Sequence, residues 1–188
     1  MIFLAGPHGA GKTRSAEIMA AFSFLPIDLG PTLRQIHRQH GAGVNFKDWI
    51  ERGEVEFGQS FTDDLLINEV KRLREILEGG DPYIDMVIVG SRSARGIEKI
   101  KNAVPCMKGR GNHVIFLDAP VNVLWRRYNE RENTGLNLSD FHDLLRVDLE
   151  IGLDSVRKTA DFILWNNDDS RHLERSLKEI LFQKLGYG

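Results

Sequence analysis

The sequence predicts an α/β fold in which a five-stranded parallel sheet lies between two layers of helices. Short apolar runs alternate with longer amphipathic segments along all 188 residues, a pattern typical of a sheet built from β-α-β units. A glycine-rich turn joins the first apolar run to the first amphipathic segment. No repeat or linker-like stretch interrupts the alternation, so we expect a single domain over residues 1–188.

Strands are expected where short apolar runs lie between turn residues. These runs are residues 2–5, 22–27, 84–89, 113–117 and 161–164. The turn after the first run, from Gly6 to Thr13, matches G-x-x-x-x-G-K-[ST]. We therefore expect the three-layer P-loop NTPase fold, with the strands in the order 2-3-1-4-5.

Helices are expected where apolar residues recur every three or four positions. The stripe of Leu66, Val70, Leu73 and Leu77 shows this spacing, and Gly79-Gly80 ends it. Helices are predicted over residues 12–21, 31–40, 46–52, 63–78, 121–132, 139–158 and 170–185.

The first turn, from Gly6 to Thr13, matches the pattern G-x-x-x-x-G-K-[ST], with a strand before it and a helix after it. Glycines let successive backbone N–H groups face phosphate oxygens, and the helix adds its positive N-terminal end. Lys12 is expected to reach the β- and γ-phosphates of ATP, and the Thr13 hydroxyl to bind Mg²⁺. The predicted nucleotide-binding residues of this segment are Gly6, Gly9, Ala10, Gly11, Lys12, Thr13 and Arg14.

Composition narrows the class of protein. The net charge of −2 argues against a broad nucleic-acid surface, and no apolar stretch approaches the roughly 20 residues that span a membrane. The motif begins at residue 6, so no signal peptide is expected before it, and the single Cys106 excludes an internal disulfide. We therefore expect a cytoplasmic protein whose partners are small-molecule nucleotides, with monomer and dimer both open.

Three classes of protein compete for this motif: small kinases, GTPase switches and motor ATPases. GTPases read guanine with Asn-Lys-x-Asp, whereas the late strand here leads into Trp165-Asn166-Asn167-Asp168, without the lysine. Motor ATPases end a strand with an acidic pair, but Asp118 is followed by Ala119-Pro120. The sequence disfavours a GTPase and leaves an ATPase, or a nucleotide sensor without an acceptor, as alternatives to a kinase.

The region after the second strand resembles the adenylate kinases and related nucleoside monophosphate kinases. Gly30-Pro31-Thr32-Leu33-Arg34 is similar to their G-D-x-L-R, with Pro31 in place of the aspartate, and Thr62-Asp63-Asp64-Leu65 is similar to their T-D-E-L. The resemblance implies an acceptor-binding helical insert at about 31–62, in which Arg34 binds the acceptor phosphate. A solvated arginine in the first helical turn is the alternative for Arg34.

The next strand ends in Val89-Gly90-Ser91-Arg92, where the same family carries D-G-x-(P)-R. The resemblance makes Arg92 a ligand of the acceptor phosphate and a catalytic residue. Val89 replaces the aspartate that orders magnesium waters in the family. Asp28, just after the second strand, is the best substitute and is assigned to the acceptor site, but it could equally cap the helix that begins near Pro31.

The C-terminal arginines resemble the lid region of these kinases. Arg127 and Arg131 are four residues apart and Arg146 and Arg157 eleven apart, so each pair is expected to share a helix face. The resemblance implies a short lid at about 132–145 and a cluster of cations around the transferring phosphoryl group. The predicted catalytic residues are Lys12, Arg92, Arg127, Arg131, Arg146 and Arg157. Surface ion pairs with nearby acids are the alternative for any one arginine.

After the last strand, the segment from Asp161 to Asn167 resembles the one that packs on adenine in related kinases. Asn166 is therefore predicted to bind the nucleotide, and a simple turn before the last helix is the alternative. The sequence favours an ATP- and Mg²⁺-dependent kinase that acts on a nucleoside monophosphate or a similar small phosphorylated metabolite. Its predicted acceptor-binding residues are Asp28, Arg34 and Arg92, and its predicted metal ligand is Thr13.

Overall fold

Five parallel strands form one sheet in the order β2-β3-β1-β4-β5 in the computed structural model. The structure describes residues 1–188 apart from 42, 59–60, 79–84, 105–110, 168–169 and 188. The strands are β1 (Ile2–Ala5), β2 (Phe24–Asp28), β3 (Asp85–Val89), β4 (His113–Asp118) and β5 (Phe162–Trp165). The predicted fold class and strand order are confirmed.

The central strand β1 pairs with β3 on one side and with β4 on the other, with Ile2 opposite both Val87 and His113. All four residues of β1 are buried, as expected for a parallel sheet that is covered on both faces. Because all the strands run the same way, their carboxyl ends meet at one edge. The glycine-rich loop after β1 leaves from that edge, as do the connections that follow β2 and β3.

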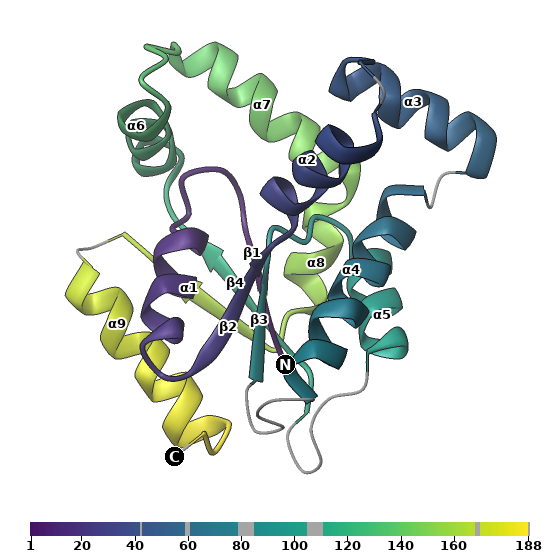
Figure 1. Ribbon diagram of the computed structural model, residues 1–188. Helices are drawn as coiled ribbons and strands as arrows, with labels where there is room; N and C mark the ends of the chain where they lie inside the picture. Colours follow the sequence, from purple (N-terminus) through teal and green to yellow (C-terminus); the bar gives the residue numbers. More distant parts are fainter. Residues whose placement is uncertain (42, 59–60, 79–84, 105–110, 168–169, 188) are drawn as a thin grey trace.

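Helices cover both faces of the sheet (Figure 1): α1 and α9 lie on one face, and α4, α5 and α8 on the other. Helices α2, α3, α6 and α7 rise beyond the carboxyl ends of the strands. The described helices are α1 (Lys12–Ala20), α2 (Leu29–His40), α3 (Phe46–Phe57), α4 (Phe61–Glu78), α5 (Ala94–Ala103), α6 (Val121–Glu132), α7 (Leu138–Ile151), α8 (Leu153–Thr159), α9 (Ser170–Lys178) and a π-helix (Glu179–Lys184).

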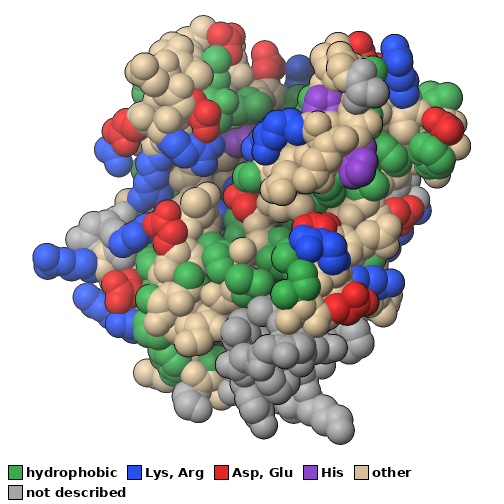
Figure 2. Space-filling view, in the orientation of Figure 1, with side chains coloured by type: hydrophobic (Ala, Val, Ile, Leu, Met, Phe, Trp, Pro, Cys, Tyr) green, Lys and Arg blue, Asp and Glu red, His purple; other side chains and the backbone are tan. Residues whose placement is uncertain are grey.

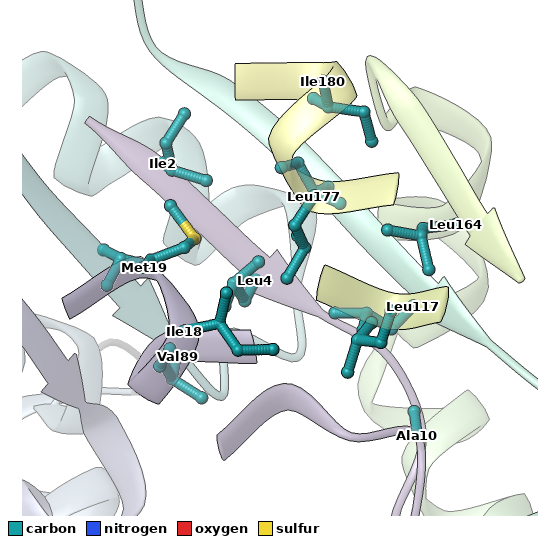
Figure 3. Close-up of a cluster of buried hydrophobic side chains, with 14 of the residues drawn as sticks. Ile2, Leu4, Ala10, Ile18, Met19, Val89, Leu117, Leu164, Leu177 and Ile180 are labelled. Carbon is teal, nitrogen blue, oxygen red and sulfur yellow. The ribbon is translucent and has the colours of Figure 1, made fainter. Parts of the chain in front are cut away.

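The core lies in two parts, one on each face of the sheet, because side chains alternate along a strand. Ile2 and Leu4 of β1 face α1 and α9, where they join a cluster that includes Met19 and Leu177 (Figure 3). Phe3, between them in sequence, faces the other way and packs in the cluster formed with α4, α5 and α8. This packing fixes the position of the carboxyl end of β1, from which the glycine-rich loop begins.

The predicted continuous helix over residues 139–158 was wrong. The structure has two helices there, and Gly152 ends α7 and begins α8 with a φ of 115°. Residues with a Cβ rarely adopt this left-handed backbone, so the glycine allows a break that helical spacing alone does not reveal. The break changes the direction in which residues after Gly152 point.

Smaller differences from the prediction concern the first and last residues of helices and strands, and one helix that was not predicted. Helix α5 was not predicted, although the Ser93 side chain caps it and Ile97 and Ile100 are buried at helical spacing. The last predicted helix continues from α9 as a π-helix. The Gly79-Gly80 stop, the first residue of the predicted third strand, and Cys106 lie outside the described residues. In the part of the chain that is described, no helix has both the length and the apolar character needed to cross a membrane.

Candidate active site

The glycine-rich loop between β1 and α1 closes tightly against the segment that follows β5. Gly11, the N-cap of α1, has a φ of 97°, which a residue with a Cβ rarely adopts. A Cβ at this position would lie 2.4 Å from Asn166 Nδ2, closer than packed atoms tolerate. The glycine therefore lets the loop curl over the N-terminus of α1, where backbone N–H groups favour an anion.

Lys12 lies inside this loop. Its Nζ donates hydrogen bonds to the backbone oxygens of Gly6 at 2.7 Å and Pro7 at 2.8 Å. Burial lowers the pKa of Lys12 to about 8, and the charge of Asp148 opposes that shift. At pH 7 the ammonium is thus still charged, and it is held by carbonyl oxygens that phosphate oxygens can replace.

Asn166 braces the loop from the side of β5. Its buried side-chain Nδ2 donates to Ala10 O at 2.8 Å, and its own backbone oxygen accepts from Arg127 Nη1 at 2.6 Å. Both residues were predicted from the sequence to act on the nucleotide or on the transferring group. The structure places Asn166 directly against the glycine-rich loop, and Arg127 reaches the loop through Asn166.

A cavity of about 860 Å³ opens at the carboxyl edge of the sheet, within the range of small-molecule sites. Figure 2 shows the hollow between the two lobes at the top of the molecule. Gly6 of the loop and Thr13 in the first turn of α1 line one side of it, and the α2 and α4 helices line another. Its charged and titratable lining residues are His8, Lys12, Asp28, Arg34, Asp63, Arg92, Tyr128, Arg131, Glu132 and Asp148.

The predicted acceptor-binding residues Asp28 and Arg34 lie at the α2 end of this cavity. Asp28 Oδ1 accepts from Gly30 N at 3.1 Å, so Asp28 both caps α2 and lines the cavity. Asp63, at the start of α4, lines the same region, and burial raises the pKa of its carboxyl above the usual value despite nearby Lys99. Apolar walls are formed by Leu33, Phe46, Ile50 and Leu66.

Arg92 lies between the glycine-rich loop and α7. Its Nη1 is 3.1 Å from Asp148 Oδ1, and its Nη2 is 3.2 Å from His8 Nε2. Burial lowers the pKa of His8 to about 4, so the ring is neutral at pH 7 and Nε2 can accept an N–H from Arg92. The 3.7 Å approach of His8 to Asp148 is therefore not an ion pair at that pH.

Two site residues, His8 and Asp148, were not predicted. His8 is one of the variable positions of the motif, and Asp148 was given no role in binding or catalysis. Residues two apart on a helix point roughly 200° apart, so Asp148 faces inward where Arg146 faces solvent. The sequence therefore indicates that Asp148 and Arg146 face opposite sides of the helix. It does not indicate which of those sides is buried.

The structure brings together only part of the predicted ring of arginines. Arg34, Arg92 and Arg131 line the cavity, and Arg131 also pairs with Glu132 at 2.7 Å. Arg146 is exposed on α7 and pairs with Asp143 at 3.3 Å and Glu150 at 4.0 Å.

The other predicted cations also point elsewhere. Arg157 Nε is 3.0 Å from Asp118 Oδ2 at the end of β4, and Arg14 pairs with Glu17 at 2.9 Å on the surface of α1. Among the described residues, the cavity lining includes none of Arg14, Arg146 and Arg157. The expected shared face of Arg146 and Arg157 was wrong, because Gly152 separates their helices.

The polar groups of the cavity fit a magnesium ion that arrives with a nucleotide. Thr13 and Asp28 both belong to the lining, and their side chains carry oxygen atoms of the kind that Mg²⁺ prefers. Mg²⁺ in phosphate sites takes one or two protein oxygens and completes its shell with water and phosphate. No group of three or more His, Cys, Asp or Glu that could hold a metal occurs among the residues that the structure describes.

Comparisons with known proteins find relatives of low identity that align along nearly the whole chain. No protein-family model matches the chain. A UPF0200 protein of Saccharolobus islandicus is 21% identical over 193 residues, covering 100% of this chain and 95% of the relative. A shikimate kinase of Nitrosospira multiformis is 27% identical over 182 residues, covering 96% of this chain and 84% of the relative.

Solved structures of similar fold include two shikimate kinases. Shikimate kinase from Acinetobacter baumannii, in complex with shikimate, has a TM-score of 0.60 and 22% identity, covering 97% of this chain and 93% of that one. Shikimate kinase from Aquifex aeolicus has a TM-score of 0.54 and 16% identity, covering 98% of each chain. At these identities the structures support the fold: the chain has the architecture of P-loop kinases, and the resemblance to such kinases seen in the sequence is confirmed.

Proposed function

We propose that this chain is an ATP- and Mg²⁺-dependent kinase that transfers the γ-phosphoryl group to a nucleoside monophosphate or a similar small phosphorylated metabolite. One observation carries the proposal: a single cavity is lined by Lys12 and Thr13 of the glycine-rich loop and by Arg34 and Arg92. A donor phosphate on the loop and an acceptor phosphate on the two arginines would share that space. A simple ATPase has no need of the second set of cations.

The cavity residues would have different roles during phosphoryl transfer. An acceptor oxygen attacks the γ-phosphorus, the bond to the β–γ bridging oxygen breaks, and ADP leaves with that electron pair. Negative charge spreads over the equatorial oxygens of the transferring group, where fixed cations stabilise it. Lys12, Arg92 and Arg131 lie at the cavity for this task, and Arg34 would hold the acceptor. Mg²⁺ bound with the nucleotide supplies further positive charge.

The proposal gives the other predicted arginines different roles. Arg127 holds the backbone of Asn166 and thereby supports the nucleotide loop. Arg146 and Arg157 reach the transferring group only if α7 and α8 move when ligands bind, because both arginines are paired outside the cavity lining.

A second acceptor class, the hydroxyl group of a small acid, is favoured by the carboxylates in the cavity. Asp28 and Asp63 both line the α2–α4 end, and a hydroxyl acceptor needs a group that accepts its proton. Arg34 would then bind the carboxylate of the acid instead of a phosphate. The similarity to shikimate kinases supports this alternative.

A coupled assay of ADP release tests these possibilities. ATP and Mg²⁺ are supplied with single members of a panel of nucleoside monophosphates and small hydroxy acids, and Lys12→Met serves as the inactive control. Turnover that requires a monophosphate supports the proposal, and turnover that requires a hydroxy acid supports the second acceptor class. Release of ADP at one rate with every acceptor and with none would identify an ATPase and refute both.

A further inference from the structure

A buried carboxylate on α7 is not explained by the roles assigned so far. Every residue of α7 is described, and Phe141 and Asp148 are the buried ones. They are seven residues apart, so they lie on the same side of the helix, two turns from one another. An apolar side chain would be the ordinary occupant of such a position, because burying a charge is costly unless it is paired.

Asp148 faces Arg92 and His8 at the mouth of the glycine-rich loop. Only 3% of the residue is exposed, and its Oδ1 lies 3.1 Å from Arg92 Nη1. That oxygen makes no well-directed hydrogen bond within the described part of the chain, so the contact is mainly an attraction between charges. Its other oxygen lies 3.7 Å from His8, which in turn contacts Arg92. The carboxylate thus approaches groups from two different loops.

A row of rings runs beside these polar contacts. The His8 ring meets the edge of Tyr128 on α6 with centroids 5.5 Å apart, and Tyr128 lies 5.5 Å from Phe141 on α7. The glycine-rich loop is therefore joined to α7 twice, through the rings and through Asp148. The ring contacts hold the helix near the loop, and Asp148 adds a charge aimed at Arg92.

We propose that Asp148 is a positioning residue that holds the Arg92 guanidinium beside the glycine-rich loop and couples α7 to nucleotide binding at that loop. The proposal rests on the kinase function proposed above. Asp148 touches neither nucleotide nor acceptor in this role. It acts through Arg92, which it pre-orients so that less reorganisation is needed when charge develops on the transferring group.

Kinetics of Asp148→Asn provide the first test. This variant keeps the shape of the side chain and removes its charge. We expect kcat to fall on the order of tenfold to a hundredfold, with the KM for ATP changed less than about threefold, because the lost interaction matters mainly in the transition state. Asp143→Asn is the matched control: it removes an exposed carboxylate from the same helix, and Arg146 keeps Glu150.

A double-mutant cycle shows whether Asp148 acts through Arg92. Once Arg92→Gln has removed the guanidinium, adding Asp148→Asn should lower kcat by less than about twofold more. Two losses that multiply in the double variant would overturn the proposal. Asp148→Leu is a control for loss of stability. An apolar residue at this buried position should leave the melting temperature unchanged or raise it. A melting temperature at or above that of the wild type, combined with the same loss of kcat, supports the proposal.

Hydrogen exchange measures the coupling without any turnover. MgATP should slow amide exchange in residues 138–151 of the wild-type protein on the order of tenfold, and Asp148→Asn should abolish most of that protection. Equal protection in both proteins would contradict the coupling. If no acceptor supports transfer, the kinase function fails while this measurement still decides the role of Asp148.

Discussion

The glycine-rich loop and the arginine-bearing helices α6–α8 both matched kinase patterns in the sequence, but the structure bears them out to different degrees. In the loop, Lys12 and Thr13 lie at the cavity as expected, next to the N-terminus of α1. In the helices, Arg131 lies at the cavity, whereas Arg146 and Arg157 pair elsewhere.

The two regions differ in the length of chain over which side-chain positions must be inferred from sequence spacing. The loop is a short segment whose shape is set by its own backbone, with glycines where a Cβ cannot fit. The arginine pattern extends over three helices, and each added residue rotates a side chain by roughly 100° only while the helix continues. Gly152 breaks that continuity, so Arg157 points to β4 instead of sharing a face with Arg146.

The largest expected effect is in the loop itself. Replacing Lys12 with Met should lower kcat on the order of a thousandfold, because a fixed cation at the β- and γ-phosphates is lost. ADP release with the preferred acceptor measures this. Arg14→Met, one helical turn from Glu17 on the surface of α1, is a matched control and should change kcat less than about threefold. Near-normal turnover of Lys12→Met would refute the assignment.

The same substitution should stabilise the ligand-free protein. The pKa of Lys12 is about 8 when folded and 10.5 in its ordinary state, so the unfolded chain binds this proton more tightly. At pH 7 the folded protein therefore bears the full cost of the buried charge, and this cost shrinks as pH rises from 8 to 10.5. We expect Lys12→Met to raise the free energy of unfolding by about 1–2 kcal/mol at pH 7, measured by chemical denaturation.

Two glycine substitutions sharpen the comparison between the regions. Gly11→Ala forces a Cβ against Asn166 at a φ of 97°, so it should distort the loop and weaken ATP binding on the order of thirtyfold. Gly152→Ala also strains a left-handed backbone, but its nearest neighbour is Ser155 Oγ at 3.6 Å. It should lower stability by about 1 kcal/mol and leave ATP affinity nearly unchanged. Calorimetric titration with ATP would show the opposite ranking if α7–α8 geometry, and not the loop, controlled binding.

Arg34→Ala tests the acceptor end of the cavity. Loss of a charge-assisted hydrogen bond should raise the KM for the acceptor about tenfold to a hundredfold, while the KM for ATP changes less than about twofold. Arg38→Ala, one turn further along the exposed side of α2, is the control and should leave both constants near their wild-type values. Equal increases in both constants for Arg34→Ala would place this arginine outside the acceptor site.

The smallest effect is expected at Arg146. Arg131→Ala should reduce kcat about tenfold, because Arg131 lies at the cavity, whereas Arg146→Ala should reduce it less than about threefold. Steady-state kinetics of the two variants, side by side, decide the matter. A larger loss at Arg146 would mean that α7 turns its outer face toward the ligands during the reaction.

Much of the fold was accessible from the sequence because its signals are local. Apolar runs located the five strands, and the glycine-rich motif gave the residues at the nucleotide end of the cavity. The break at Gly152 could not be predicted from the sequence, because a glycine within a helical pattern can adopt either a helical or a left-handed backbone conformation. Asp148 was missed for a related reason: whether a charged residue on an amphipathic helix faces solvent or a cavity depends on the packing of distant segments.

The acceptor end was only partly predictable. Arg34 was predicted from the resemblance to the G-D-x-L-R motif, and Asp28 from its position just after the second strand. The apolar wall that includes Phe46 and Leu66 forms only when α3 and α4 pack over the sheet edge. Tertiary contacts of this kind shape the volume that selects an acceptor. The shape and volume of the cavity therefore could not be predicted from the spacing of residues along the chain.

Transfer of label from [γ-³²P]ATP is the most direct test of a cavity shared by donor and acceptor. The protein is incubated with labelled ATP, Mg²⁺ and the acceptor panel, and the labelled products are separated. The account predicts that the label appears in one class of acceptor and that Lys12→Met prevents this. Label found only in inorganic phosphate, formed equally fast without any acceptor, would contradict it.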